Sequence, residues 1–215
     1  MSIKSIWGDN RDNVLVIISA IILLADVIAQ WMGFAPAAKL LPLILAVFVG
    51  LGLYYWEESS RKKVLILVVA ILASFLIGLI DLKIYFPFGH SSFGSVLGFK
   101  VLGVPFGLGL LWLLATISAW QIVNFGRLTR FNKYFLAGGL AIMFSLVLEQ
   151  FASSFSLWSW RSGQMPALNF AGWLALSGVT FYLYDRYLKP LKPSLYLASL
   201  LPMLSIYFWL MMLVR

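Results

Sequence analysis

Long apolar stretches alternate with short polar connections along the whole chain. Seven of the apolar stretches come close to the roughly 20 residues that a helix needs to cross the hydrocarbon core of a membrane. Because they are apolar throughout and do not alternate apolar with polar residues, the pattern favours helices over the strands of a membrane barrel. The predicted spans are residues 13–33, 37–56, 63–82, 101–123, 133–152, 169–188 and 193–214. We therefore expect an all-α, polytopic membrane helix bundle that forms one domain over residues 1–215.

The composition and the distribution of charge support this prediction. Hydrophobic residues make up 62% of the 215 residues and charged residues 11%, whereas soluble domains have roughly 45–50% apolar and about 25% charged residues. The net charge of +8 comes from basic residues in short clusters between the apolar stretches. This pattern sets orientation in a membrane and does not indicate nucleic-acid binding. Eleven of the 16 basic residues fall on the side of the N-terminus, so we expect that terminus in the cytoplasm and the C-terminus on the outer side.

The sequence excludes several kinds of chemistry. It contains no cysteine, and His90 is its only histidine. Neither a thiolate site nor a site with two histidines can form, and we expect no metal centre. No phosphate-binding loop, nucleophile elbow or zinc-protease motif is present. The remaining candidates for chemistry are carboxyl groups.

Asp26, Asp81 and Glu149 lie inside apolar stretches. An acidic residue at the centre of a membrane helix costs about 2.5–3.5 kcal/mol on insertion scales, so each is a candidate functional residue. In the predicted topology their three helices run in the same direction and place each acid in the outer half of its helix. If these helices are neighbours, the three carboxyl groups meet at one depth. The alternative is structural: Asp26 pairs with Gln30 on the same helix face, and Asp81 lies solvated at the membrane surface near Lys83.

Aromatic residues near Glu149 indicate what this acid could do. A carboxylic acid in apolar surroundings keeps its proton more readily and can act as a general acid. Trp158, Trp160 and Trp173 lie close to Glu149 in the sequence, and a ring face stabilises a cation by roughly 0.5–2 kcal/mol. An acid in a ring-lined apolar pocket can protonate an alkene and shelter the resulting carbocation. The alternative is that the tryptophans belong to the aromatic belt at the membrane surface.

Five segments of the chain form a distinctive series: FPFG (86–89), LGFKVLGVP (97–105), Trp112, LVLEQFA (146–152) and LWSWRSGQMPALNFAGW (157–173). In their order and spacing they resemble the membrane-bound carotenoid biosynthesis protein family, which includes the bacterial and archaeal carotenoid 1,2-hydratases. The resemblance covers roughly residues 75–187. It implies a multi-helix enzyme in the inner membrane of a bacterial or archaeal cell, in contact with membrane lipid. Its substrate would be an apolar polyene, an acyclic carotenoid such as lycopene.

The reaction that this resemblance implies needs no organic cofactor. A proton adds to C2 of the terminal double bond, a tertiary cation forms at C1, and water attacks C1 to give a tertiary alcohol. Glu149 would donate the proton, and Asp81 or Asp26 would position or deprotonate the water, with His90 as a further candidate. In the family an Asp commonly stands one turn before the Glu. This chain has Ser145 there. Either Asp26 or Asp81 supplies the second carboxyl, or the chain is a divergent member of the family with altered chemistry or none.

The resemblance also implies a set of residues around the substrate. They are Phe88, Trp112, Trp158, Trp160, Asn169 and Trp173. The tryptophans would line the pocket or shelter the cation, and Asn169 would orient Glu149 or the water.

Two other interpretations fit the same residues. A carotenoid cyclase or isomerase shares the first protonation, but an internal alkene captures the cation in place of water. Its product therefore has the mass of the substrate, whereas hydration adds one water. A non-catalytic lipid- or pigment-binding membrane protein, or a small transporter, would leave its apolar ligand unchanged.

Overall fold

The computed structural model describes residues 10–34, 37–84, 91–161, 167–188 and 190–214. Within these ranges the chain forms seven α-helices. They are α1 (Asn10–Trp31), α2 (Ala37–Tyr55), α3 (Ser60–Lys83), α4 (Phe106–Phe125), α5 (Arg130–Ser154), α6 (Ala167–Tyr187) and α7 (Leu195–Leu213). The prediction of an all-α, polytopic membrane bundle is confirmed.

The surface of the bundle fits a lipid environment. In the described part of the chain, five helices are long and apolar enough to cross a membrane, namely α1, α3, α4, α5 over residues 130–152, and α7; the apolar part of α2 is shorter. Large apolar side chains such as Ile17, Ile21 and Leu24 of α1 are exposed. A continuous exposed apolar surface of this kind marks contact with a membrane. The chain is therefore an integral membrane protein.

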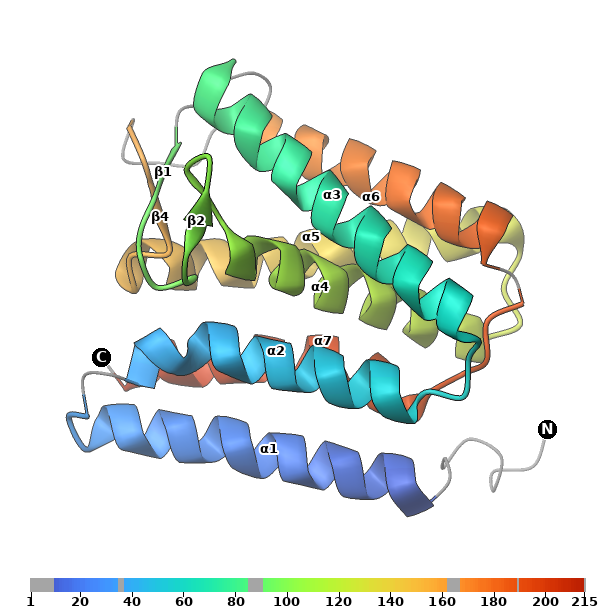
Figure 1. Cartoon of the computed structure of the whole chain (residues 1–215), viewed down its shortest axis with the longest axis horizontal. Helices are drawn as coiled ribbons and strands as arrows, with labels where there is room; N and C mark the ends of the chain where they lie inside the picture. Colours follow the sequence, from blue (N-terminus) through green and yellow to red (C-terminus); the bar gives the residue numbers. More distant parts are fainter. Residues whose placement is uncertain (1–9, 35–36, 85–90, 162–166, 189, 215) are drawn as a thin grey trace.

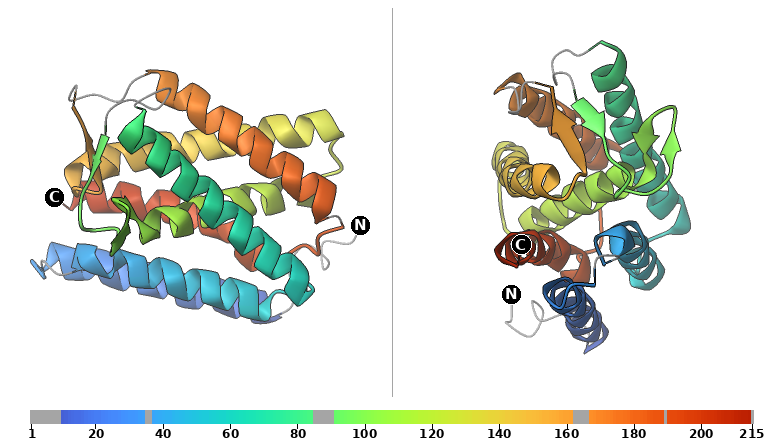
Figure 2. Two further views of the ribbon diagram at one scale, coloured as in Figure 1. Left: turned by 45° about the horizontal axis from the view of Figure 1, so that its top comes forward. Right: turned by 90° about the vertical axis from the view of Figure 1, so that its left-hand side faces the viewer.

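Helix α4 forms the centre of the bundle. It is buried on nearly all sides and packs against α2, α3, α5, α6 and α7, as the end-on view shows (Figure 2). Helix α1 lies outside α2 and α7, whereas α3 and α6 cover the opposite side of α4 (Figure 1). The helices run roughly along one axis, and α1 begins at the end of the bundle opposite to the end of α7.

The fourth helix begins later than predicted. In place of a helix from residue 101, Lys100–Val101 (β2) and Val104–Pro105 (β3) form a short antiparallel hairpin, and α4 starts at Phe106. Two backbone features explain this correction. Leu102 and Gly103 have positive φ angles of 51° and 90°, as a tight hairpin turn requires. Pro105 also disfavours a helical conformation at the residue before it.

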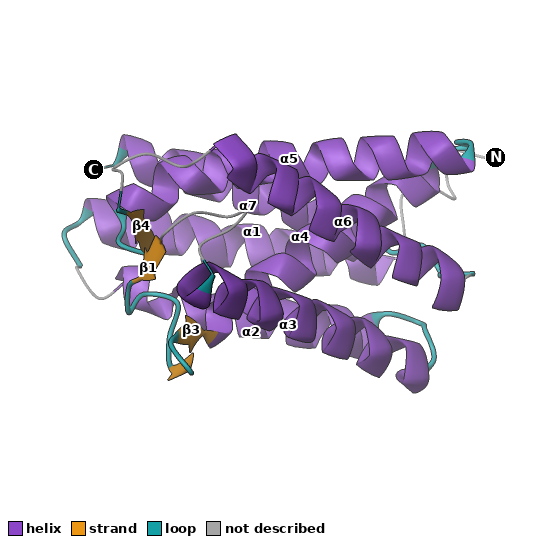
Figure 3. Ribbon diagram, turned by 90° about the horizontal axis from the view of Figure 1, so that it is seen from above, coloured by secondary structure: helices purple, strands orange, loops and turns teal. Residues whose placement is uncertain are grey.

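Two further short strands were not predicted. Ser91–Phe93 (β1), in the connection between α3 and α4, pairs antiparallel with Trp158–Trp160 (β4), in the connection between α5 and α6. The pair closes one end of the bundle (Figure 3). Beside it, the Gly94 N–H donates to the Leu157 carbonyl at 2.8 Å. The two connections are so close that a Cβ at Gly94 would lie 1.7 Å from the Ser156 carbonyl oxygen.

Replacing Gly94 by alanine should therefore weaken the contact between the two connections. We expect Gly94→Ala to lower the free energy of unfolding by about 1–3 kcal/mol, the usual cost of an overpacked site. Thermal unfolding of the purified protein in detergent micelles measures this change. Gly139→Ala is the matched control, because nothing lies within 4 Å of a Cβ at that position in α5. Equal melting temperatures for the two variants would contradict the prediction.

Candidate active site

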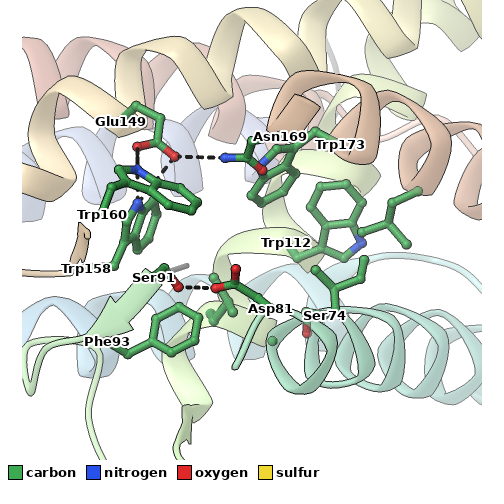
Figure 4. A pocket seen from close by; sticks show the side chains of 14 residues that line it. Ser74, Asp81, Ser91, Phe93, Trp112, Glu149, Trp158, Trp160, Asn169 and Trp173 are labelled. Carbon is green, nitrogen blue, oxygen red and sulfur yellow. Dashed lines mark hydrogen bonds between the residues drawn. The ribbon is translucent and has the colours of Figure 1, made fainter. Parts of the chain in front are cut away.

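A pocket lies at the end of the bundle that β1 and β4 close, with walls from α3, α4, α5 and α6 (Figure 4). The space between the lining side chains measures about 480 Å³ when the part open to the surroundings is included, and the cavity itself about 40 Å³. Its lining is mainly aromatic and aliphatic. Its polar side chains are Ser74, Asp81, Ser91, Glu149 and Asn169.

The carboxyl group of Glu149 is held by N–H groups from three side chains. The Trp158 indole nitrogen lies 3.3 Å from Oε1 and 3.1 Å from Oε2, and the Trp160 indole nitrogen lies 3.0 Å from Oε2. The amide nitrogen of Asn169 lies 3.5 Å from Oε1. These donors offset part of the cost of placing a carboxyl group in apolar surroundings. They also fix its orientation toward the pocket.

The strand conformation of β4 explains why both tryptophans reach the same acid. Successive side chains of a strand point to opposite faces, so Trp158 and Trp160 share one face and Ser159 points to the other. The Ser159 hydroxyl lies 2.8 Å from the hydroxyl of Ser92 in the paired strand. Before the strand, the chain reverses direction through Ser156, which has a positive φ of 57°. This turn brings β4 back along the last turns of α5, where Glu149 lies.

Asp81 faces the same pocket from the last turn of α3. Its side chain is buried, and Oδ2 accepts a hydrogen bond from the Ser91 hydroxyl of β1. Figure 4 shows the carboxyl group directed into the pocket. Because Asp81 is buried, the alternative of a solvated position at the membrane surface near Lys83 is wrong. Asp81 and Glu149 are close enough for their charges to interact.

Aromatic rings form much of the remaining wall. Trp112 of α4 and Trp173 of α6 lie with ring centroids 4.7 Å apart at 44°. Phe93 of β1 closes the side near Asp81. The pocket thus combines two carboxyl groups with ring faces. That arrangement can protonate an apolar double bond and stabilise a cation.

Seven of the residues singled out from the sequence line this pocket. They are Asp81, Trp112, Glu149, Trp158, Trp160, Asn169 and Trp173. Phe88 and His90 lie outside the described residues. Among the residues that are described, no group of three or more His, Cys, Asp or Glu side chains gathers as a metal site would require.

Asp26 lies away from the pocket. Only two of the three acids that we expected to meet, Asp81 and Glu149, do so. The helix of Asp26, α1, packs against α2 and α7 on the far side of α4 from the pocket. Asp26 is buried there, and its Oδ2 accepts a hydrogen bond of 2.6 Å from the Tyr207 hydroxyl. Equal depth in the membrane does not bring two groups together when their helices are not neighbours.

Sequence reasoning missed Ser74, Gly78, Ser91 and Phe93 as pocket residues. Ser91 and Phe93 lie on β1, and three alternating residues are too short a signal to identify a strand. Gly78 and Ser74 lie about one and two helical turns before Asp81, on the same face of α3. Once Asp81 is taken as a site residue, this spacing would have identified both.

Trp160→Phe tests the support that the indole donors give to Glu149. The variant keeps the ring wall but removes the donor 3.0 Å from Oε2. We expect the free energy of unfolding to fall by about 1 kcal/mol, because the half-buried carboxyl group of Glu149 loses one of its donors. Thermal unfolding in micelles measures the change. Trp209→Phe, on the exposed face of α7, is the control and should change the free energy of unfolding by less than about 0.5 kcal/mol.

A double-mutant cycle identifies the cause of this change. If Trp160 acts through Glu149, Trp160→Phe should cost much less when Glu149 is already glutamine. An equal cost in both backgrounds would show that the indole N–H does not support the carboxyl group.

Comparison with known proteins identifies the family of this chain. A family model described as carotenoid biosynthesis protein matches residues 37–215, which include the whole pocket but not α1. Bisanhydrobacterioruberin hydratase of Haloarcula japonica is 29% identical over 153 residues, which are 67% of this chain and 50% of that protein. The chain thus spans about half the length of this curated relative. No solved structure matches it. Because the family model matches well over half of the residues, the chain belongs to the carotenoid biosynthesis protein family.

Proposed function

We propose that this chain hydrates the terminal C1–C2 double bond of an acyclic carotenoid end. The observation that carries the proposal is that Asp81 and Glu149 face one aromatic-walled pocket inside a membrane bundle. The hydratase name of the relative supports water as the second reactant. An apolar polyene is also the kind of substrate that reaches such a pocket from the bilayer.

The two carboxyl groups share one proton in this proposal. Two negative charges close together in a site with little water disfavour each other, so one group stays neutral. Indole and amide N–H groups can only donate hydrogen bonds, and three of them point at Glu149. They fit its ionised form best. The Ser91 hydroxyl can donate or accept, and so it fits either form of Asp81.

This difference favours Asp81 as the proton donor and Glu149 as the carboxylate, which reverses the roles expected from the sequence. Asp81 transfers its proton to C2, and a tertiary cation forms at C1. Water attacks C1 through its oxygen and loses a proton to Glu149. The proton then returns from Glu149 to Asp81. The sum is one alkene and one water giving one tertiary alcohol, with no cofactor.

The surrounding side chains contribute in two ways. The carboxylate of Glu149 and the ring faces of Trp112 and Trp173 stabilise the positive charge at C1. Asn169 holds the Oε1 atom of Glu149 and so fixes the acceptor for the proton of water.

We place the rest of the polyene along the interface of α3 and α6, from this pocket to a second cavity, and call this line the groove. These two helices lie side by side (Figure 3), and the pocket includes the half-exposed Ile77 and Leu176, one from each helix. The second cavity, between the same helices, lies nearer the other end of the bundle. Its lining residues are Leu65 and Val69 of α3, Leu183, Tyr184 and Tyr187 of α6, and Leu188 just after α6. From Leu65 to Asp81 the helix rises about 24 Å. An extended apolar chain could therefore lie in this groove with its end at the two acids.

Expression in cells that make an acyclic carotenoid tests the reaction. We expect pigment whose mass is increased by one water at one end or both. Glu149→Gln and Asp81→Asn should each reduce this product at least about 100-fold, because either change removes a group that handles the proton. Mass analysis of the extracted pigments measures the product, and the protein level in the membrane checks folding.

Asp26→Asn is the matched control, because it also changes a buried acid but lies away from the pocket. It should retain near-normal yield. Normal yield from Glu149→Gln would rule out the assignment, and a product of unchanged mass would favour a cyclase or isomerase. Unchanged pigment that copurifies with the protein would indicate a binding protein.

A bulky residue in the groove tests where the chain of the substrate lies. Val69→Trp fills the second cavity and should reduce hydration of a long carotenoid about tenfold, equivalent to about 1.4 kcal/mol. A short isoprenoid with the same end group should be hydrated normally. Val68→Trp, on the exposed face of α3, serves as control. Equal loss with long and short substrates would place the chain elsewhere.

A further inference from the structure

A row of buried polar side chains extends from the pocket along the interface between α4 and α6. Both helices run away from the pocket, and ring contacts fix their register. Trp112 lies against Trp173, and eight residues further along each helix Trp120 stacks on Phe181 at 5.5 Å. Side chains three or four residues apart share a helix face. We call the following set the polar file: Trp112, Thr116 and Trp120 of α4 with Ser177, Thr180 and Tyr184 of α6.

Four members of the polar file have polar atoms without a hydrogen-bond partner among the described residues. They are the indole nitrogens of Trp112 and Trp120 and the hydroxyls of Ser177 and Thr180. These side chains are only 0–2% exposed. Most serines and threonines inside a helix bond to a carbonyl of the preceding turn, as Thr116 does to the Trp112 carbonyl at 2.9 Å. Ser177 and Thr180 do not.

Buried polar groups without protein partners commonly hold internal water, which makes about three hydrogen bonds to such groups. The polar file supplies such hydrogen-bonding groups for water along one segment of the interface between α4 and α6. The Thr116 and Tyr184 hydroxyls, 3.1 Å apart, lie between the two tryptophans and retain further capacity to donate or accept. Figure 4 shows the Trp112 nitrogen on the side of its ring away from Asp81.

The other end of the polar file approaches the end of the bundle. The Tyr134 ring lies 5.7 Å from the Trp120 ring, and the Arg130 guanidinium lies 6.0 Å from the Tyr134 ring. Arg130 in turn forms an ion pair of 2.8 Å with Asp185 and is well exposed. The row of polar groups therefore extends from an ion pair whose arginine is exposed to the wall of the pocket.

We propose that the polar file holds a chain of water molecules that supplies the pocket from the Arg130 end. This inference rests on the proposed hydration, because that reaction consumes one water per turnover. The groove between α3 and α6 offers an apolar route for the polyene, and the interface between α4 and α6 offers a polar route for water, with Tyr184 bordering both. The two reactants then meet at Asp81 and Glu149 from different directions.

Radiolytic hydroxyl labelling of the full chain in micelles tests whether water is present, independently of any activity. An X-ray pulse makes radicals from water beside a side chain, so buried tryptophans react only where water is bound. After correction for intrinsic reactivity, we expect Trp112 and Trp120 to be labelled at least about tenfold faster than the equally buried Phe208. Ser177→Ala/Thr180→Val should reduce that labelling about threefold. Ser205→Ala, whose hydroxyl bonds to its own helix, should not.

Labelling no faster than that of Phe208, or labelling that the double variant does not change, would overturn the proposal. The two single variants repeat the test if the double variant unfolds. These outcomes hold even if the chain hydrates no carotenoid, so failure of the proposed function is recognised separately.

Deuterium incorporation tests the supply of water to the reaction. In isolated membranes that already contain unlabelled carotenoid and are transferred to D₂O, the double variant should form about tenfold less hydrated pigment. It should also show more deuterium in recovered substrate, because the cation forms at the normal rate but loses a proton before water arrives. Loss of product without this extra deuterium would indicate damage to the protonation step, and it would refute the supply role.

Discussion

The hydrogen bonds to Glu149 hold the candidate site together. Their donors come from β4 and α6, and their acceptor from α5, so three segments are fixed relative to one another. β4 also pairs with β1, which places the Ser91 hydroxyl against Asp81 of α3. A carboxyl group in a membrane interior is tolerated only when such partners are present. The same contacts that make Glu149 tolerable therefore determine the position of the second acid and the shape of the pocket.

The bundle separates two environments that the proposed reaction has to bring together. One face of α6 borders the apolar groove beside α3, and another carries the polar file against α4. α6 is not among the described helices that are apolar enough to count as a span. Its buried polar residues account for part of its lower mean hydropathy. A third face of α6 is apolar and points outward, with Leu174, Val179 and Tyr182 at least half exposed. The acids lie where the two faces converge.

The sequence predicted the helices well because each is a long apolar stretch, and length makes such a signal robust. It failed where few residues decide the conformation. The turn at Leu102 and Gly103 delays α4, and β1 and β4 have three residues each. Seven pocket residues were named in advance, yet the alternation that turns both tryptophans toward Glu149 was not recognised. Depth along a helix could be predicted from the sequence, but the neighbours of each helix could not.

Asp26 shows why burial in a membrane does not by itself identify a functional acid. It is as deeply buried as Asp81, with exposures of 6% and 4%, and the sequence treats the two alike. Asp26, however, is held by the Tyr207 hydroxyl within the packing of α1 on α7, and it does not line the pocket. Asp81 faces a second carboxyl group across open space. An acid that fastens two helices needs a partner and close packing, whereas an acid that transfers a proton needs a partner and room for a reactant. The cavity beside the carboxyl group, which only the three-dimensional structure reveals, therefore separates the two roles.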